Sequence, residues 1–559
     1  DVINAGLGDD RITIDGIGNK DVNGGSGTDT LIINYDGITS LSSFASISYD
    51  TDTSTVTFTD SSGGTIATQA VENFTVGGVT YSFVYNGYDS RTGKQVNTGA
   101  SSDISNGENN RISHAFISSD GTEVVLYTPS SGVTNFTIPS MSAFQDTDTW
   151  LDSTLTITGS SAADMISDRG GMGVSGSLGV LTVNAGAGDD QVKIASLTGN
   201  QDVINLGAGD DIVYVGGDYA SDNLDGGSGS DWVSFTFAYF YKYVDSDGNE
   251  YSDYASGRTS VALGVAYTLN SNNALNFENI GGTTQDDVLT GDSGNNILLG
   301  GKGADILYGN SGDDTLFGGV GETSSDTQLN NDQNFTTGLY YNHYYQGAGN
   351  DKLYGGAGND TLYGQALDDH LDGGTGKDTY SGGSGSDTFV IRAGDGDTTL
   401  ANANVIRDFE DGTDVIGLAD GLSYSSLTIE QGAVGSDYAD YTIVRNGSEY
   451  LFIIQTQTGS GGCCSGGTQQ AGFLATNLTA TDFMSTSTVS QSFTGDASNE
   501  VFIGGAGNDT FTGNGGNDVV FGHGGDDTFN IIGKSGAYTD LVNGGSGTDT
   551  LIINYDGIT

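Results

Sequence analysis

Gly355-Gly356-Ala357-Gly358-Asn359-Asp360-Thr361-Leu362-Tyr363 is the clearest copy of a nine-residue pattern that returns throughout residues 281–390. Each copy places glycines before an acidic residue or its amide, and a large apolar side chain two residues after it. A step of nine fits neither a helix nor a hairpin of alternating strands, but it fits a six-residue turn followed by a three-residue strand. The stretch therefore predicts a flattened parallel coil in which each nonapeptide forms half a turn.

The glycines and the apolar residues of the pattern have separate roles in such a coil. A turn this tight visits positive φ, where a Cβ atom would clash, so the turn positions favour glycine. The apolar residue of each copy is expected to point inward and to stack on its equivalents in a narrow core formed by Leu289, Leu298, Leu307, Leu316, Leu353, Leu362, Leu371, Tyr380 and Phe389.

The acidic positions predict a metal ion. Successive coils would lie about 4.8 Å apart, which makes neighbours of carboxylates eighteen residues apart, such as Asp351 and Asp369. Two bare charges about 5 Å apart repel by roughly 3 kcal/mol at an effective dielectric near 20. The donors at hand are carboxylates and turn carbonyls, and such all-oxygen sites suit calcium better than zinc or copper. The simpler interpretation, Gly-Asp pairs in exposed turns, explains one copy but not nine at a constant step.

The pattern Gly-Gly-x-Gly-x-Asp-x-hydrophobic-x resembles the RTX family of calcium-binding nonapeptide repeats, which form parallel β-rolls in secreted bacterial proteins. The resemblance implies that calcium lies in the turns between alternate coils, held by the aspartates and by turn carbonyls. Asn296, and Gln365 with Leu367, depart from this pattern.

We call residues 281–390 the main ladder. Similar turns occur outside it, near both ends of the chain and around residues 181–235. Their steps are less regular, nineteen from Asp10 to Asp29, which suggests one regular and one irregular edge. Catalytic and organic cofactor residues are not predicted. The predicted metal-binding residues are Asp10, Asp29, Asp190, Asp211, Asp231, Asp287, Asp305, Asp314, Asp351, Asp360, Asp369, Asp378, Asp387, Asp509, Asp518, Asp527 and Asp549.

The composition limits the possible partners. Among 559 residues, 72 are acidic and 16 basic, which gives a net charge of −56. Such a polyanion should repel itself and stay open when calcium is scarce. It also argues against DNA, RNA or an anionic membrane as a partner, because each of these needs a basic face. The chain has no apolar run of the roughly twenty residues that a membrane span needs, and no signal peptide.

The two ends of the chain share a sequence. Residues 23–39 read NGGSGTDTLIINYDGIT, and residues 543–559 read the same without a change. This identity is most simply explained by a tandem array with a unit of about 520 residues, the offset 543 − 23. Fibres, stalks and surface coats are built from such repeats, whereas an enzyme has little use for copies of itself in a row.

We expect an all-β protein made of parallel β-roll segments with inserted antiparallel, sandwich-like modules. The expected domains are a roll at 1–39, an antiparallel module at 40–180, a roll at 181–235, a β connection at 236–280, the main roll at 281–421 with a tyrosine-rich loop at 322–346, a small β module at 422–494 and a final roll at 495–559.

Several motifs have open interpretations. The loop containing Tyr340–Tyr345 could contact a neighbouring chain or a glycan, or could fold back on its own roll. Cys463 and Cys464 could form a vicinal disulfide, remain free thiols or link to another chain. The histidines at 114, 343, 370 and 523 lie far apart, and no nucleophile elbow, His-Glu-x-x-His or phosphate-binding loop occurs.

The leading functional hypothesis is a non-enzymatic, calcium-rigidified repeat unit of a large secreted protein that forms an extracellular filament, surface layer or adhesin stalk. The alternatives are the secretion and folding module of an exported RTX enzyme, and an adhesive module that binds glycans. Neighbouring copies of the same repeat are the expected partners. The resemblance further implies export to the bacterial cell surface by type I secretion, followed by folding in extracellular calcium.

Overall fold

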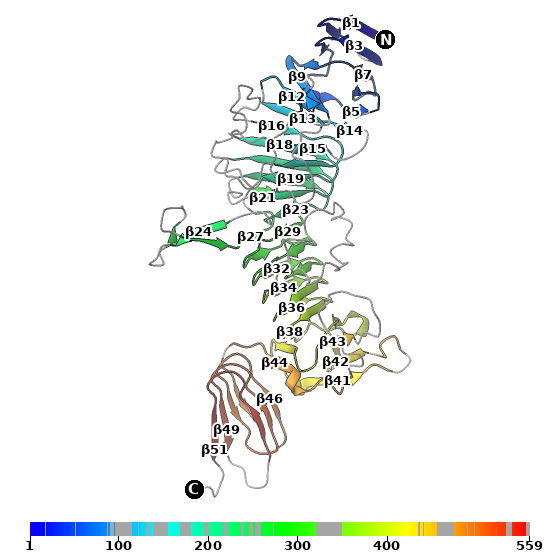
Figure 1. The fold of residues 1–559 in the computed structure, drawn as a ribbon. Coiled ribbons are helices and arrows are strands. Elements are labelled where there is room, and N and C mark those ends of the chain that lie inside the picture. The colour runs from blue at the N-terminus through cyan, green and yellow to red at the C-terminus, as the bar shows by residue number, and fades with distance from the viewer. Residues whose placement is uncertain are drawn as a thin grey trace. The chain divides into compact units, whose positions relative to one another are not determined.

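The computed structural model describes residues 1–16, 18–50, 52–85, 88–89, 94–95, 114–120, 122–129, 134–137, 155–167, 180–194, 201–215, 222–235, 240–244, 250–251, 259–271, 273–319, 349–433, 436–439, 441–455, 474–488, 490–496, 498–532 and 539–554. This part of the chain consists of β-strands and of single-turn 3₁₀ helices at Leu41–Ser43, Leu400–Asn402, Tyr424–Ser426 and Ala480–Asp482 (Figure 1). The expected all-β class with parallel roll segments is confirmed. The chain forms two compact units, residues 1–263 with 269–281, and residues 264–268 with 282–559.

The first unit starts with two short parallel sheets. β1 (Val2–Leu7) pairs with β3 (Lys20–Ser26), and β2 (Arg11–Ile14) pairs with β4 (Thr30–Ile33). Both pairs keep the nineteen-residue register of the Asp10-to-Asp29 step, as Arg11 opposite Thr30 illustrates. The first residues of the chain therefore form two half-coils of a roll.

Antiparallel strands extend both of these sheets. β7 joins β3 and β8 joins β4 in parallel, and the other strands follow in hairpins. Phenylalanine rings fill the space between the sheets, with ring centroids 5.3 Å apart for Phe58 and Phe74 and for Phe74 and Phe116. The strands are β5 (Ser46–Asp50), β6 (Thr55–Thr59), β7 (Thr65–Gln69), β8 (Asn73–Val76), β9 (Val79–Tyr85), β10 (Tyr88–Asp89), β11 (Lys94–Gln95), β12 (His114–Ser118) and β13 (Glu123–Leu126).

The antiparallel pairing does not continue to residue 180, which corrects that expectation. β16 (Leu155–Thr158) pairs in parallel with both β13 and β18 (Leu181–Ala187). Likewise β15 (Thr134–Thr137) pairs in parallel with β17 (Asp164–Ser167). Alternation of apolar and polar residues is common to both kinds of strand, so the pattern could not give the strand direction.

The rest of the first unit is a parallel coil with a long step. One sheet continues from β18 through β20 (Val203–Ala208) and β22 (Asn223–Ser228) to β28 (Ala274–Leu275), and the other from β17 through β19 (Gln191–Ile194), β21 (Ile212–Val215) and β23 (Trp232–Ser234) to β29 (Asn279–Gly281). Three further strands, β24 (Phe240–Val244), β25 (Glu250–Tyr251) and β26 (Thr259–Leu263), form a separate antiparallel sheet. β14 (Thr128–Pro129) lies along β5.

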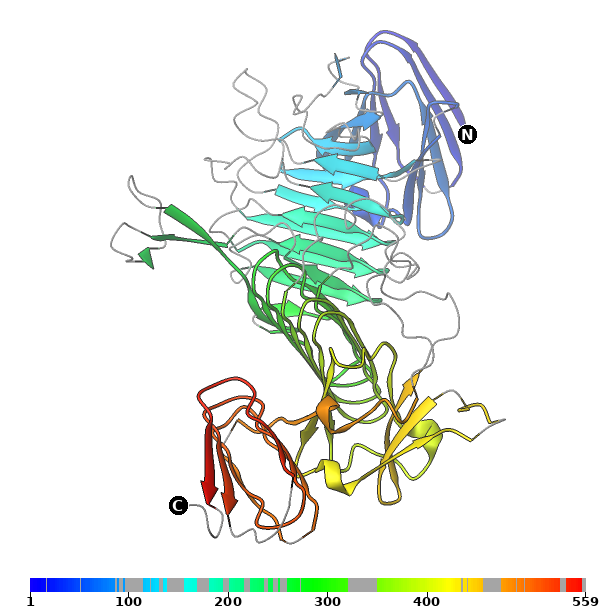
Figure 2. The same cartoon turned by 60° about the horizontal axis from the view of Figure 1, so that its bottom comes forward.

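The second unit contains the main ladder, whose coils appear as stacked loops in Figure 2. Alternate half-coils enter two parallel sheets. One holds β27 (Ala266–Thr268), β30 (Val288–Thr290), β32 (Ile306–Ser311), β34 (Lys352–Ala357), β36 (His370–Thr375), β38 (Thr388–Arg392), β40 (Val415–Ala419) and β44 (Phe483–Ser485). The other includes β31 (Ile297–Leu299), β33 (Thr315–Phe317), β35 (Thr361–Ala366), β37 (Thr379–Ser384) and β39 (Asn404–Ile406).

The inward residues of these coils form the core that the period of nine predicts. All nine expected side chains, from Leu289 to Phe389, have no exposed surface. The register is the same before and after the expected loop at 322–346, since Leu307 pairs with Leu353 and Leu316 pairs with Leu362. β34 to β37 run for six residues rather than three, because the backbone pairing continues through the turn glycines, as between Gly356 and Gly374.

Two smaller elements complete the second unit. β41 (Leu427–Gln431), β42 (Tyr441–Asn446) and β43 (Glu449–Gln455) form an antiparallel meander, and β43 joins β39 in parallel. A second short roll then has β45 (Ser492–Thr494), β47 (Thr510–Thr512), β49 (Thr528–Ile532) and β51 (Thr550–Asn554) in one sheet and β46 (Val501–Ile503), β48 (Val519–Phe521) and β50 (Leu541–Asn543) in the other.

Candidate metal sites

The aspartates of the main ladder form a hydrogen-bonded column along each edge of the roll. On one edge, the backbone N–H of Asp351 donates to Oδ1 of Asp369 at 2.8 Å, and the N–H of Asp369 donates to Oδ1 of Asp387 at 2.9 Å. Each carboxylate thus accepts from the coil before it. The column starts with Asp287, whose N–H donates to Asp305 at 2.7 Å, and ends at Asp414.

The other edge repeats this arrangement. Here the N–H groups of Asp314 and Asp360 donate to Oδ1 of Asp360 and Asp378, at 2.7 and 3.0 Å. Asn296 occupies the same position despite its departure from the motif, because its N–H donates to Oδ1 of Asp314 at 2.8 Å. The sequence therefore placed the aspartates of both edges correctly in space.

In most of the seventeen predicted metal-binding aspartates, one carboxylate oxygen is buried without a hydrogen-bond partner. The oxygen is Oδ2 in each case, and it would face a full desolvation penalty if it remained charged and unpaired. Thirteen of the seventeen predicted residues share this property: Asp10, Asp29, Asp190, Asp211, Asp231, Asp305, Asp314, Asp351, Asp360, Asp369, Asp378, Asp387 and Asp527.

A glycine packs closely against nine of these oxygens, those of Asp29, Asp305, Asp314, Asp351, Asp360, Asp369, Asp378, Asp387 and Asp527. A Cβ atom on Gly364 would lie 2.3 Å from Oδ2 of Asp369 and 2.7 Å from the carbonyl oxygen of Gly382. The same holds at Gly309, where the distances to Oδ2 of Asp314 and to the carbonyl oxygen of Gly355 are 2.4 and 2.5 Å. Two acceptor oxygens therefore crowd each of these glycines and leave no room for a side chain. The buried carboxylate oxygen that lacks a partner still needs a cation or a proton nearby.

The acid strengths of the carboxyl groups reflect the same deficit. Burial is the main cause that raises the pKa of both Asp305 and Asp369 to about 9, and neighbouring carboxylates raise it further. Burial likewise raises the pKa of Asp351, Asp378 and Asp387 to about 7. Without a bound cation, much of the inner ladder would be protonated rather than charged near neutral pH.

The donor set fits a calcium ion. Carboxylate and carbonyl oxygens in a glycine turn are hard ligands, and calcium accepts six to eight of them in variable geometry. Among the described residues, no three His, Cys, Asp or Glu side chains gather as a metal-binding group. An ion in these turns would therefore take an aspartate Oδ2 and several backbone carbonyls, and it would neutralise the charge that the fold buries.

A second, outer column of acids and amides was missed in the sequence. Where the residue immediately before a ladder aspartate is Asp or Asn, it can accept a hydrogen bond from the following coil, as Asp368 does from the N–H of Ser386 at 2.9 Å and Asn359 from that of Lys377 at 3.0 Å. The inner column accepts from the preceding coil, so the two columns tie neighbouring coils in opposite directions. The Asp or Asn at this position, as in Asn359-Asp360, was the available signal.

The first unit contains the same inner column with wider spacing. Asp190 and Asp211 donate from their N–H groups to Oδ1 of Asp211 and Asp231, at 2.7 and 2.9 Å. The opposite edge uses Asp202 and Asp222, which were not predicted because their spacing is irregular. Leu181 donates to Asp202 at 2.8 Å, which places this carboxylate in the roll as well.

Glutamates close two of these columns, and neither was predicted. The N–H of Asp29 donates to Oε2 of Glu72 at 2.7 Å, and the N–H of Asp231 donates to Oε2 of Glu278 at 2.8 Å. Both glutamates immediately precede an asparagine that is the first residue of a strand, Asn73 of β8 and Asn279 of β29. The Glu-Asn pair was the signal, but two copies without a fixed step did not stand out.

Four of the predicted residues differ from the others. Asp287 already accepts from the N–H groups of Val265 and Thr283, at 2.6 and 2.5 Å, and Asp509 from those of Gln491 and Gly505, at 2.7 and 2.9 Å. Asp518 is buried but lacks an orphaned oxygen, and Asp549 is exposed. Glu500, which takes the place of an aspartate, does have a buried Oε2 without a partner.

Two residues that break the glycine pattern keep its backbone conformation. Gln365 and Leu367 have φ of 85° and 77°, in the region that favours glycine. The turn therefore forms although both residues have a Cβ atom, and their backbone is strained in this conformation.

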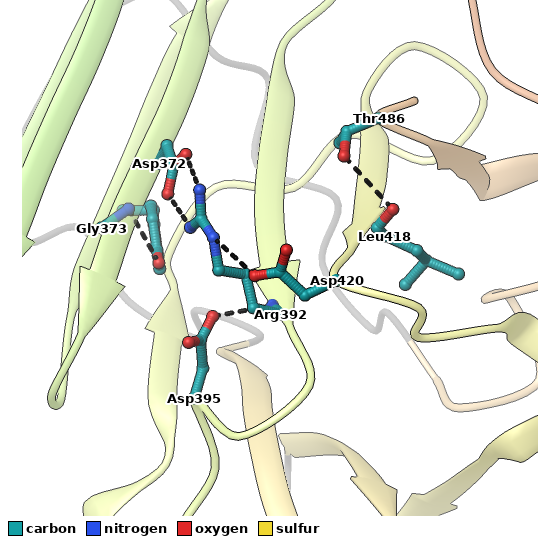
Figure 3. Close-up of polar contacts among 8 residues, drawn as sticks. Asp372, Gly373, Arg392, Asp395, Leu418, Asp420 and Thr486 are labelled. Carbon is teal, nitrogen blue, oxygen red and sulfur yellow. Dashed lines mark hydrogen bonds and ion pairs between the residues drawn. The ribbon is translucent and has the colours of Figure 1, made fainter. Parts of the chain in front are cut away.

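A guanidinium group at the end of β38 neutralises neighbouring carboxylates (Figure 3). Arg392 of β38 holds Asp372 of β36 through both terminal nitrogens, and its Nε lies 3.3 Å from Oδ2 of Asp420. Its backbone N–H donates to Asp395 at 2.7 Å. Asp372 and Asp395 are buried, so the roll here uses a side chain as its cation.

The two histidines of the nonapeptides, His370 and His523, are partly buried. Burial lowers the pKa of both His370 and His523. A ring nitrogen of His523 lies 2.9 Å from the carbonyl oxygen of Phe483. Tyr340–Tyr345 and Cys463–Cys464 lie outside the described residues, as does His343.

Comparisons with known proteins agree with this geometry. The chain matches the RTX calcium-binding nonapeptide repeat at residues 198–219, 290–322, 347–369, 366–389, 494–529 and 534–552. It therefore carries RTX repeats, and such repeats bind calcium, have no catalytic role of their own and are typical of proteins exported by type I secretion. No curated protein matched the chain in sequence.

A solved structure similar to the chain is that of the extracellular lipase LipA from Serratia marcescens. The identity is 16%, and the match covers 63% of this chain and 42% of the lipase chain, with a TM-score of 0.14. The chain thus spans less than half of that enzyme's length. In the described residues, no helix is both long and apolar enough to cross a bilayer.

Proposed function

We propose that this chain, which carries RTX calcium-binding repeats, is a structural unit that calcium rigidifies within a large extracellular tandem-repeat protein. The observation that carries the calcium part is the series of thirteen buried Oδ2 atoms without partners, six of which also lie beside a glycine and a backbone carbonyl oxygen. The seventeen predicted aspartates are the proposed ligands, and the thirteen with an orphaned oxygen are the strongest among them.

The mechanism follows from the charge that the fold brings together. With a net charge of −56, the extended chain repels itself, and folding adds the cost of burying carboxylates. When calcium binds, it supplies the opposing charge at the turns, and the coils can then stack on each other. The chain would stay open in the low calcium of the cytoplasm and close in millimolar calcium outside the cell.

The array part rests on the identity of residues 23–39 with 543–559. Rolls that continue from one copy into the next would form a filament, surface layer or adhesin stalk whose main partners are neighbouring copies. We infer no catalytic role. The exported-enzyme alternative would require a catalytic domain elsewhere in the full protein and a single copy of this unit.

Circular dichroism and calcium counting test the proposal together. In millimolar calcium, we expect a strong β signal and several ions per chain by equilibrium dialysis. In excess chelator at pH 8, the signal should collapse and return when calcium is restored. A β signal that is the same in both conditions would refute the role of calcium.

A further inference from the structure

The same seventeen residues have different surroundings at the two ends of the chain. In the first copy, Leu31 and Ile33 of β4 are 0% and 2% exposed. In the second copy, the equivalent Leu551 and Ile553 of β51 are 51% and 56% exposed. Since the sequences are identical, the difference comes from what lies against each strand.

Residues 40–85 cover the first copy. β8 pairs with β4, with Phe74 opposite Leu31 and Val76 opposite Ile33. β7 pairs with β3 in the same way, with Thr68 opposite Val22. Leu31 and Ile33 thereby join a core with Phe44, Phe58 and Phe74.

The second copy ends its sheets. β51 follows β49 at the end of one sheet, and β50 follows β48 at the end of the other, within the described residues. Both strands keep the parallel register of a roll that can accept a further strand, with Phe529 opposite Leu551 and Val520 opposite Val542. The exposed edge is therefore apolar, in register and unprotected, which strand edges in soluble proteins normally avoid.

The aspartate column stops at the same place. Asp29 is fully buried, and Glu72 accepts its N–H. Its equivalent Asp549 accepts from the N–H of Asp527 at 3.1 Å, as Asp29 accepts from Asp10 at 2.8 Å, but Asp549 is exposed. A second Glu72 would close this column as the first closes its own.

We propose that residues 541–554 are the docking surface for residues 40–85 of the next repeat unit. Those residues would cover β50 and β51 as residues 40–85 of this chain cover β3 and β4. The folding unit of the array then crosses the boundary of the sequence repeat: the last roll of one copy and the antiparallel strands of the next share one core. This inference rests on the proposed tandem array, and it names the surfaces that join two copies.

The test adds the proposed partner to the full chain. Residues 1–559 are followed directly by a second copy of residues 40–129, and hydrogen exchange is measured by mass spectrometry in calcium. A matched control carries Phe58→Asp and Phe74→Asp in the added copy only. Peptides must begin before Asn543, because residues 543–559 alone cannot be distinguished from 23–39.

We expect the amides of residues 550–553 to exchange at least about tenfold more slowly with the intact extension than without it. They should approach the rate of residues 30–33, and the control should lose the effect. Equal exchange of residues 550–553 with the intact and with the substituted extension would overturn the proposal. Calcium-dependent protection of β34 to β38 in the same samples reports separately on the proposed function.

Discussion

At the scale of single residues, the unusual feature is a carboxylate with one oxygen bonded and the other left over. In Asp369, Oδ1 accepts from the N–H of Asp351, and Oδ2 is buried beside Gly364 without a hydrogen-bond partner. An asparagine could keep the first contact but would replace Oδ2 with an amide group. The two oxygens of one side chain therefore serve different purposes, coil stacking and ion binding.

We expect Asp369→Asn to lower the stability of the calcium-bound chain by about 1–3 kcal/mol and to reduce the number of bound ions. Urea unfolding in calcium and equilibrium dialysis measure the two effects. Asp368→Asn is the matched control, because this neighbour is exposed and its Oδ1 contact with Ser386 survives the change. Equal losses in both variants would contradict the assignment of Oδ2 to an ion.

The raised pKa values predict how the folding stability of the metal-free chain depends on pH. Burial raises the pKa of Asp360 to about 6, of Asp387 to about 7 and of Asp369 to about 9, from ordinary values near 4. The folded state then binds more protons than the unfolded state between about pH 4 and pH 9, so folding stability falls as pH rises through this range.

In chelator, we therefore expect more β structure at pH 5 than at pH 8 by circular dichroism. With saturating calcium the sign reverses, because protons then compete with the ion for the same oxygens. A metal-free chain that gains β structure on going from pH 5 to pH 8 would contradict this account.

At the scale of the element, the nonapeptide turn depends on its glycines to different degrees. Gly356 has φ of 112°, and a Cβ there would lie 2.0 Å from the carbonyl oxygen of Asn310. Leu367 has φ of 77° but is 50% exposed, so its strain is conformational rather than steric.

We expect Gly356→Ala to destabilise the calcium-bound chain by more than about 2 kcal/mol. Leu367→Gly should be neutral or stabilising by up to about 1 kcal/mol, since it relieves a left-handed leucine but adds freedom to the unfolded chain. Thermal unfolding in calcium compares the two. A destabilised Leu367→Gly variant would show that the leucine side chain contributes packing that its exposure does not suggest.

The stability of β36 and β38 depends on the ion pair between Arg392 and Asp372. Loss of the arginine would leave Asp372 buried without a partner, and breaking such a pair costs about 3–5 kcal/mol. We expect Arg392→Met to unfold at lower urea with an unchanged calcium count, and Asp372→Leu combined with Arg392→Met to regain most of the stability. A calcium count that falls in Arg392→Met would instead connect the arginine to an ion site.

The sequence allowed the regular elements to be predicted and concealed the irregular ones. A constant step placed Leu289 to Phe389 in the core, because each repeat needs the same turn and the same inward residue. Asp202, Asp222, Glu72 and Glu278 serve the same columns, but loops of variable length separate them and hide the register. Strand direction after residue 129 was also hidden, since alternation is the same in parallel and antiparallel strands.

At the scale of the whole molecule, the balance of charge should control its dimensions. We expect chelation at pH 8 to increase the hydrodynamic radius measured by dynamic light scattering, and calcium to reverse the change, because the released carboxylates repel each other. Magnesium at the same concentration should be much less effective, since it requires nearly ideal octahedral geometry. Full compaction by magnesium would mean that general charge screening, rather than a coordination site, folds the chain.

A crystal structure determined in millimolar calcium, with anomalous scattering to identify the ions, tests the central claim most directly. It should show calcium at about 2.3–2.6 Å from Oδ2 of ladder aspartates such as Asp351 and Asp369 and from turn carbonyl oxygens. Ordered rolls in which those Oδ2 atoms bind only water or carry protons would contradict the claim that calcium holds the coils together.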